Sequence, residues 1–176
     1  VINSQVKNLT AFLDSYHRLT HLPEPEYKTV SVPALFTKLE RLLQAEPRSE
    51  RVVYCDGKAD KSTGKELQVY GDANLLTLAL INLIRNALQA VEGQEDGIVR
   101  VDTCAGATGH LLITITDNGP GIPPERLSAI FTPFFSTKSG GSGIGLPISQ
   151  RIMQLHGGQL SVSSIPNVRT EFRMEF

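Results

Sequence analysis

The sequence lacks several features that would assign it quickly to a class of protein. It has no tryptophan, and its two cysteines, Cys55 and Cys104, stand far apart without a CxxC spacing or a cluster of histidines. Neither a disulfide framework nor a zinc site is indicated, so we expect reduced, structural thiols. The formal net charge of −1 gives no electrostatic reason to expect nucleic acid or an anionic membrane as a partner.

Long apolar runs are also missing. No segment approaches the roughly 20 apolar residues that a membrane-spanning helix needs, and no signal peptide opens the chain. The chain begins at Val1 without an initiator methionine, which suggests a piece excised from a longer protein. We therefore expect a soluble, cytoplasmic chain, whose parent would reach a membrane only through segments upstream of this sequence.

What the sequence does contain is enough apolar residue, 40% of 176, for one substantial core. Apolar residues recur every three or four positions between Ile2 and Leu19, as on one face of an amphipathic helix. Pro23 and Pro25 end this pattern. We therefore divide the chain into an N-terminal helix with its linker, residues 1–26, and a main domain, residues 27–176.

The main domain mixes helical and strand patterns without an internal repeat. Hairpin-like strand pairs predict a mixed sheet and an α+β protein. Helices are predicted at residues 33–46, 72–91, from about 123 and at 144–156, and strands at 51–55, 66–70, 98–104, 111–116, 159–164 and 170–176.

The predicted helix after Asp72 carries an unusual polar stripe. It is apolar almost all round, yet Asn82, Arg85, Asn86 and Gln89 share one face through their spacing of three and four. Plain solvent faces are usually filled with lysine and glutamate, and each asparagine weakens a helix by about half a kcal/mol relative to alanine. A stripe that lines a site is therefore favoured over an ordinary solvent face.

Two later segments have features of a site, but each has a simpler alternative. Asp117 stands where a strand ends, from which a carboxylate can point into a pocket, although Asp-Asn-Gly-Pro is also ordinary turn chemistry. The glycines 140–145 match neither a P-loop nor a Rossmann fingerprint. In front of a helix they can still form an anion site, or they can be a mobile linker.

Four segments together are far more specific than any one of them. NLIRNALQAV, DNGPGI, FTPFFSTK and GSGIGL follow in this order at fitting distances. They resemble the four boxes of the ATP-binding domain of bacterial sensor histidine kinases, in the superfamily shared with gyrase, the Hsp90 chaperones and MutL. The resemblance covers residues 27–176. Among these kinases, the sequence is most similar to those of the nitrogen-regulation type.

The resemblance implies a fold and a domain organisation. It predicts a two-layer α/β sandwich in which a mixed, mostly antiparallel sheet packs against helices. Residues 1–26 would then be the second helix of a dimerisation hairpin and its linker, and residues 27–176 the catalytic ATP-binding domain.

The resemblance also implies roles for residues of this chain. Asn86 would offer its side-chain oxygen to Mg²⁺, Asn82 would face the phosphates, and Asp117 would accept a hydrogen bond from the amino group of adenine. Asn82, Arg85 and Lys138 are the catalytic candidates; for Arg85, stabilising transition-state charge and pairing with an acidic neighbour are equally favoured. The remaining predicted ATP contacts are Gly119, Gly121, Ile122, Phe131, Thr137, Lys138, Ser139, Gly141, Ser142, Gly143, Ile144, Gly145 and Leu146. The resemblance also implies that Phe131, Phe134 and Phe135 anchor the loop over the triphosphate by packing.

Asn82 separates subclasses within the superfamily. Relatives that hydrolyse ATP or phosphorylate serine have a glutamate there as general base, whereas a neutral imidazole is already a nucleophile. We therefore predict transfer of the ATP γ-phosphoryl group to a histidine. In the family that this sequence resembles, the acceptor histidine lies in the first hairpin helix and is followed by an acidic residue. None of His17, His21, His110 and His156 fits this pattern, so the acceptor would lie on a hairpin helix absent from this chain.

The expected partners follow from this hypothesis. They are ATP, the protein's own hairpin in a homodimer and the receiver domain of a response regulator, with no nucleic acid. The alternative hypothesis is an ATP-driven clamp or a nucleotide-sensing module that never transfers phosphate.

Overall fold

The computed structural model describes residue 17 and residues 20–55, 66–105, 110–136 and 141–176. Its helices are α2 (Val32–Leu43), α3 (Ala73–Ala90), α4 (Pro124–Leu127) and α5 (Gly145–Leu155), with a short 3₁₀ turn at Ser49–Arg51. Its strands are β1 (Lys28–Ser31), β2 (Val52–Cys55), β3 (Gln68–Gly71), β4 (Val99–Ala105), β5 (Leu111–Asp117), β6 (Gln159–Ile165) and β7 (Arg169–Glu175).

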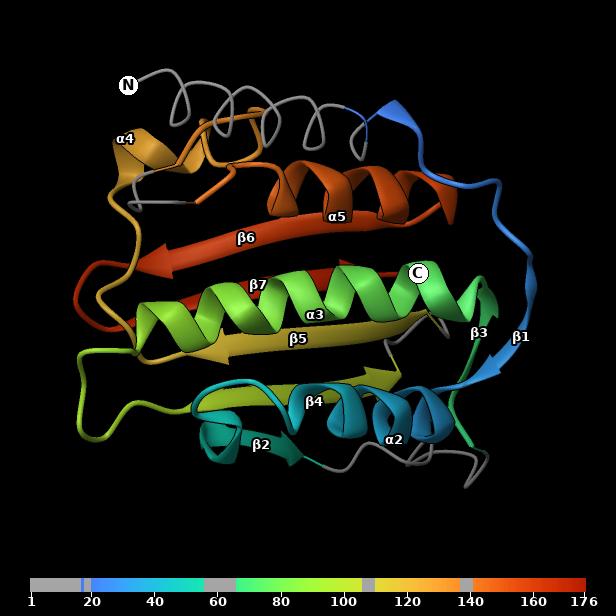
Figure 1. Cartoon of the computed structure of the whole chain (residues 1–176), viewed down its shortest axis with the longest axis horizontal. Coiled ribbons are helices and arrows are strands. Elements are labelled where there is room, and N and C mark those ends of the chain that lie inside the picture. The colour runs from blue at the N-terminus through green and yellow to red at the C-terminus, as the bar shows by residue number, and fades with distance from the viewer. Residues whose placement is uncertain (1–16, 18–19, 56–65, 106–109, 137–140) are drawn as a thin grey trace, which may run out of the picture.

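The described strands form two sheets. Five of them make the main sheet in the order β2-β4-β5-β7-β6, with β2 and β4 parallel and the other neighbours antiparallel. β1 and β3 form a separate antiparallel ribbon. Helices α2, α3 and α5 cover one face of the main sheet (Figure 1). The predicted α+β fold, a two-layer sandwich with a mixed, mostly antiparallel sheet, is confirmed.

The central helix α3 forms where the sequence places a cap and an apolar surface. The side chain of Asp72 accepts the backbone N–H groups of Asn74 and Leu75, as expected of an N-cap residue. Leu76, Leu80 and other apolar side chains of α3 are buried between the sheet and the neighbouring helices. No helix of the described segments is long and apolar enough to pass through a bilayer.

The predicted elements of the main domain are present, with ends shifted by about three residues at most. Strand β1 is an addition that the sequence pattern did not predict. Its four residues follow two prolines and lie opposite Gln68–Gly71, so a partner distant in sequence defines the strand. The predicted N-terminal amphipathic helix lies almost entirely outside the described residues.

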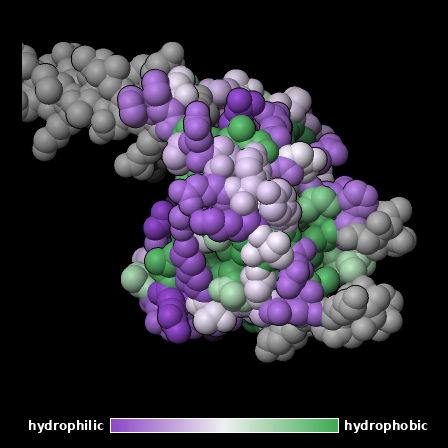
Figure 2. Space-filling view, turned by 90° about the vertical axis from the view of Figure 1, so that its right-hand side faces the viewer, coloured by the Kyte–Doolittle hydropathy of each residue, from purple (hydrophilic) through white to green (hydrophobic). Residues whose placement is uncertain are grey.

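The two ends of the sandwich differ in what they gather. One end carries β1, β3, the start of α3 and the end of α5, and Figure 2 shows its surface as mainly hydrophilic with smaller apolar patches. The opposite end carries α4, the segment after β5 and the β6–β7 hairpin (Figure 1). The segment after β5 and the second half of α3 border a cleft.

Candidate nucleotide-binding site

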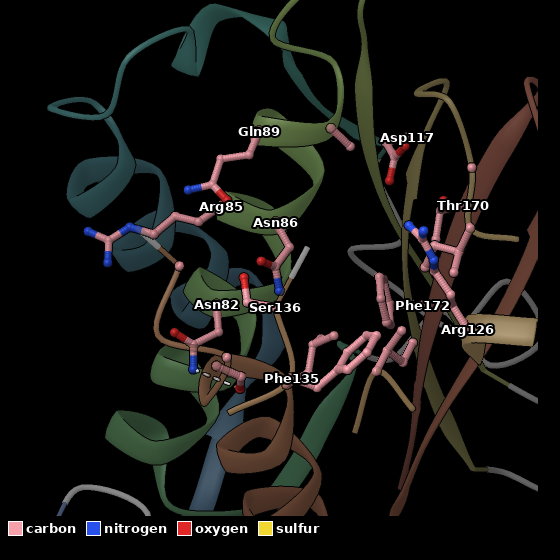
Figure 3. A pocket seen from close by; sticks show the side chains of 18 of the residues that line it. Asn82, Arg85, Asn86, Gln89, Asp117, Arg126, Phe135, Ser136, Thr170 and Phe172 are labelled. Atoms are coloured by element: carbon pink, nitrogen blue, oxygen red, sulfur yellow. Dashed lines mark hydrogen bonds between the residues drawn. The ribbon is translucent and has the colours of Figure 1, made fainter. Parts of the chain in front are cut away.

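A cleft of about 570 Å³ lies between the second half of α3 and the sheet end formed by β5 and β7. Figure 3 shows Asn82, Asn86 and Gln89 on one side of this cleft, and Asp117, Thr170 and Phe172 on the facing side. A cleft of this size is in the range that holds small molecules and cofactors. It brings together segments separated by almost a hundred residues.

The polar stripe of α3 lines this cleft, as its spacing predicts. All four members, Asn82, Arg85, Asn86 and Gln89, contribute to the wall. Arg85 turns away from the facing wall (Figure 3), and its Nε and Nη2 donate to Oε1 of Glu46, with the Nε bond at 3.0 Å. Of the two roles left open for Arg85, the structure shows the pairing with an acidic neighbour, Glu46.

Asn82 links α3 to the start of α5. Its Nδ2 lies 3.3 Å from the carbonyl oxygen of Gly145 and 3.5 Å from Oγ of Ser149, which is fully buried. Helix α5 begins at Gly145, beside the cleft, and no side chain caps it. Backbone N–H groups of its first turn therefore point toward the cleft. Such a helix start favours an anion through its N–H groups and its dipole.

Asp117 is the last residue of β5 and is only 2% exposed. Its Oδ1 accepts the backbone N–H of Gly119 at 2.9 Å, and the carboxylate lines the cleft. A Cβ at position 119 would lie 2.7 Å from that oxygen and 3.0 Å from Cβ of Ala90. Glycine at 119 therefore lets the turn lie close under a carboxylate that is fixed by its own strand.

The aromatic segment before the glycines packs only in part as predicted. Phe131 and Phe135 pack against the core, and Phe135 also lines the cleft. Phe134, predicted to pack with them, is 39% exposed, because its φ of 66° turns the side chain out of the core. Its N–H instead donates to the carbonyl oxygen of Gly143, which connects this segment to the start of α5.

Most of the predicted ATP contacts meet in this cleft. Those that line it are Asn82, Asn86, Asp117, Gly121, Ile122, Gly141, Ser142, Gly143, Gly145 and Leu146. Gly119, Phe131 and Ile144 support the wall without lining it. Thr137, Lys138 and Ser139 lie outside the described residues.

The cleft also contains residues to which the sequence assigned no contact. These are Ala90, Pro120, Pro123, Arg126, Ile130, Phe135, Ser136, Thr170 and Phe172. Thr170 lies directly opposite Asp117 across the β5–β7 pair and is 4% exposed. The alternating pattern of the last strand predicts that Thr170 and Phe172 share a face, but the register that brings Thr170 to Asp117 is visible only in the structure.

The donor set fits a hard metal ion that is shared with a phosphate ligand. In the described part of the chain, no group of three His, Cys, Asp or Glu side chains could hold a metal alone. Asn86 places a carboxamide in the cleft between Asp117 and the start of α5. Mg²⁺ is commonly held by one or two protein oxygens together with waters and phosphate oxygens, so these residues fit that ion.

Comparison with known proteins identifies the family. The profile described as "Histidine kinase-, DNA gyrase B-, and HSP90-like ATPase" matches residues 71–176. Sensor histidine kinase ZraS of Salmonella typhimurium is 43% identical over 98 residues, 56% of this chain and 21% of ZraS. Sensory histidine kinase/phosphatase NtrB of Vibrio alginolyticus is 33% identical over 180 residues, 97% of this chain and 49% of NtrB. The chain thus spans half or less of these relatives.

Solved structures agree with the sequence comparison. The nucleotide-free catalytic domain of histidine kinase ThkA has a TM-score of 0.69 and 27% identity, and the match covers 86% of this chain and 95% of that one. The mycobacterial sensor histidine kinase MprB has a TM-score of 0.68 and 27% identity, with 86% and 97% covered. The chain therefore belongs to the histidine kinase-, DNA gyrase B- and HSP90-like ATPase family, and within it contains the ATP-binding catalytic domain typical of sensor histidine kinases.

Proposed function

We propose that this chain binds ATP with Mg²⁺ in the cleft and donates the γ-phosphoryl group to a histidine on a dimerisation hairpin of its parent protein. One observation supports this most strongly. A single cleft joins Asp117, the Asn82–Asn86 face of α3 and the start of α5, which are three segments far apart in sequence. Their chemistry suits the base, the metal-bound phosphates and the free phosphate oxygens of one nucleotide.

Asp117 would select the base. Its carboxylate, held by β5 and by the N–H of Gly119, would accept a hydrogen bond from the exocyclic amino group of adenine. Guanine presents a carbonyl oxygen at that position, so two acceptors would meet without a hydrogen between them. Thr170 adds a hydroxyl beside the carboxylate, and Ile122 adds an apolar surface at the same end.

The phosphates would lie between α3 and the start of α5. Asn86 would bind Mg²⁺ through its side-chain oxygen, and the ion would neutralise charge on the phosphate oxygens. Gly143 and Gly145 allow the backbone at the start of α5 to approach the phosphates, where its N–H groups would orient them. Positioning and electrostatic stabilisation of this kind are the main contributions a protein makes to phosphoryl transfer.

The acceptor follows from the neutral side chain at position 82. Among the described residues that line the cleft, Asp117 is the one carboxylate, and it belongs to the base end. Asn82 donates to Gly145 and Ser149 and is no general base. Water or a serine hydroxyl would need such a base, whereas the imidazole of histidine attacks without one. Weak ATP hydrolysis by the isolated chain is therefore expected.

The partners come from the relatives. ThkA has been solved in complex with the response regulator protein TrrA, and we extend this kind of partnership to the parent of this chain. The phosphoryl group would pass from the hairpin histidine to a receiver domain. The parent would be a homodimer through its hairpin, as the family resemblance implies.

The experiment combines this chain, γ-labelled ATP, Mg²⁺ and a separately produced histidine-bearing hairpin from the same parent. Label on the hairpin that is lost at acid pH and retained in alkali would support a phosphohistidine. Tight ATP binding without labelled hairpin would favour the nucleotide-sensing alternative. Asn86→Asp is the variant for the metal: we expect an altered Mg²⁺ concentration dependence of ATP binding, and an unchanged dependence would remove Asn86 from the proposed coordination.

A further inference from the structure

Three polar residues lie in a row across the cleft end of the main sheet. Asp117 of β5 is directly opposite Thr170 of β7, and Thr170 is directly opposite Ser164 of β6. Directly opposed residues of antiparallel strands project from the same face of a sheet. The parallel row one step further into the sheet consists of Ile115, Phe172 and Val162, which pack in or against the core.

Ser164 is the member of this row that does not line the cleft, yet it contacts two parts of the wall. Its Oγ accepts the backbone N–H of Ile122 at 2.8 Å. The same oxygen lies 3.0 Å from the carbonyl oxygen of Arg169 and 3.2 Å from Oγ1 of Thr170. One hydroxyl thus joins the turn after β5, the β6–β7 hairpin and the side chain beside Asp117.

The hydrogen of the Ser164 hydroxyl determines what Thr170 can offer. A hydroxyl donates once and accepts twice. When Ser164 donates to the carbonyl oxygen of Arg169, it can accept both the N–H of Ile122 and the O–H of Thr170. All these groups are then satisfied, and the hydroxyl oxygen of Thr170, which lines the cleft beside Asp117, is left as an acceptor.

We propose that Ser164 is a positioning residue for the base of the bound nucleotide, acting through Thr170 and Ile122. It orients the Thr170 hydroxyl as a second acceptor beside Asp117, which suits the amino group of adenine and disfavours the carbonyl of guanine. It also fixes the N–H of Ile122 and so the apolar surface under the base. The bond from the N–H of Asn167 to the carbonyl oxygen of Pro120, 2.8 Å, holds the same hairpin against the same turn.

This inference rests on the proposed function, and its test is a comparison of three ligands. The affinities of Mg²⁺ with ATP, with GTP and with inorganic tripolyphosphate are measured by calorimetry for the whole 176-residue chain. We expect Ser164→Ala to weaken ATP binding roughly five- to tenfold, the effect of one or two hydrogen bonds. The ATP-to-GTP ratio should fall, while binding of tripolyphosphate, which has no base, should stay unchanged.

Matched variants separate positioning from general stability. Ser163→Ala removes the exposed neighbouring hydroxyl on the other face of β6 and should leave all three affinities unchanged. Ser164→Thr retains the hydroxyl and should restore the ATP-to-tripolyphosphate ratio. Cysteine has nearly the same shape as serine but hydrogen-bonds weakly, so Ser164→Cys should also lower the affinity for ATP and the ATP-to-GTP ratio, by less than Ser164→Ala. This variant keeps the test available if the alanine variant does not fold.

The possible failures are distinguishable. A wild-type chain that binds ATP no more tightly than GTP and tripolyphosphate would refute the proposed base site itself. A selective wild-type chain combined with unchanged ratios in the folded alanine or cysteine variant would refute the role of Ser164 alone. An equal loss for ATP and tripolyphosphate would show that Ser164 acts on the whole domain and would also overturn the proposal.

Discussion

The two ends of helix α3 use the same residue type for different purposes. At its start, Asp72 accepts the backbone N–H groups of Asn74 and Leu75 through Oδ1 and that of Glu26 through Oδ2. Beside its second half, Asp117 accepts the N–H of Gly119 and lines the cleft. Both carboxylates are buried and both stand at the end of a strand, but Asp72 caps α3 whereas Asp117 lines the cleft.

The start of α3 is surrounded by groups that bind one another. The backbone N–H of Asp72 donates to Nε2 of His156 at 2.9 Å, and Nδ1 of His156 lies 2.7 Å from the carbonyl oxygen of Ile152. The hydroxyl of Tyr27 donates to the carbonyl oxygen of Leu155 at 2.5 Å, and its ring meets His156 edge-on. These contacts attach the segment around residue 26 to the domain, so we expect changes there to affect stability rather than binding.

The pKa of Asp72 reflects this environment. Burial raises the pKa of its carboxyl group, but the backbone N–H groups of Glu26, Leu75 and Asn74 and the electrostatic interaction with His156 outweigh burial and lower it below its ordinary value of 3.8. A carboxyl group whose pKa is lowered by folding stabilises the folded state at pH values above the ordinary pKa. That contribution is lost as the pH falls through the lower pKa of the folded state.

The largest expected effect is at the cleft. Asp117→Asn should weaken ATP binding by about 100-fold or more, because it removes a charged acceptor and can turn an NH₂ group toward the amino group of adenine. Calorimetric titration with MgATP measures this, and Asp72→Asn is the matched control at the other end, with wild-type affinity expected. Wild-type affinity in Asp117→Asn would show that the base binds elsewhere.

Two glycines with the same backbone conformation, one at each end of α5, allow a second comparison. Gly143 at the cleft and Gly157 after α5 have φ values of 66° and 68°. A Cβ at 143 would lie 2.6 Å from the carbonyl carbon of Phe134 and 2.7 Å from the oxygen of Phe135, whereas at 157 it would meet nothing within 4 Å.

Gly143→Ala should therefore disturb the loop and weaken MgATP binding by about tenfold or more, from strain of about 1–2 kcal/mol with the clash in addition. Gly157→Ala adds only the conformational strain, so stability should fall by about 1 kcal/mol with affinity unchanged. Calorimetry and denaturant unfolding of both variants give the comparison. Equal effects on affinity would show that the clash at 143 is relieved without cost.

Asp72→Ala should cost about 1–2 kcal/mol in the free energy of unfolding at pH 7, as expected for loss of an N-cap. Affinity for MgATP should not change. The difference from the wild type should shrink as the pH falls below 3.8, because the wild-type carboxylate then loses its own contribution. Urea unfolding between pH 2.5 and 7 measures this, and a difference independent of pH would contradict the role assigned to the charge.

The same contrast explains which features were predictable from the sequence. The cap at Asp72 and the stripe of Asn82, Arg85 and Asn86 depend on spacing within one helix, and both were found. The ion pair between Arg85 and Glu46 depends on how α2 lies beside α3, so sequence left the role of Arg85 open. Local patterns were readable because they depend on neighbours three or four residues apart.

Features that depend on strand register were not readable. Strand β1 exists through its pairing with β3, and the row of Asp117, Thr170 and Ser164 exists through two registers across three strands. The exposed position of Phe134 depends on a positive φ that an aromatic residue rarely adopts. In each case contacts between distant segments, rather than local preference, determine the structure.

The smallest expected effect tests whether the two ends are independent. Tyr27→Phe removes only the hydroxyl that donates to Leu155 and leaves the ring against His156, so we expect a loss of about 0.5–1 kcal/mol in the free energy of unfolding. Helix α5 runs from Gly145 at the cleft to Leu155 at this contact. If the affinity for MgATP changes by less than about twofold, the coupling free energy is below about 0.5 kcal/mol. Loss of this hydrogen bond at the end of α5 would then have no effect on binding at its start. A larger shift in affinity, with Lys28→Ala as an exposed control in β1, would instead show that attachment of this segment and binding of nucleotide are coupled through the two ends of one helix.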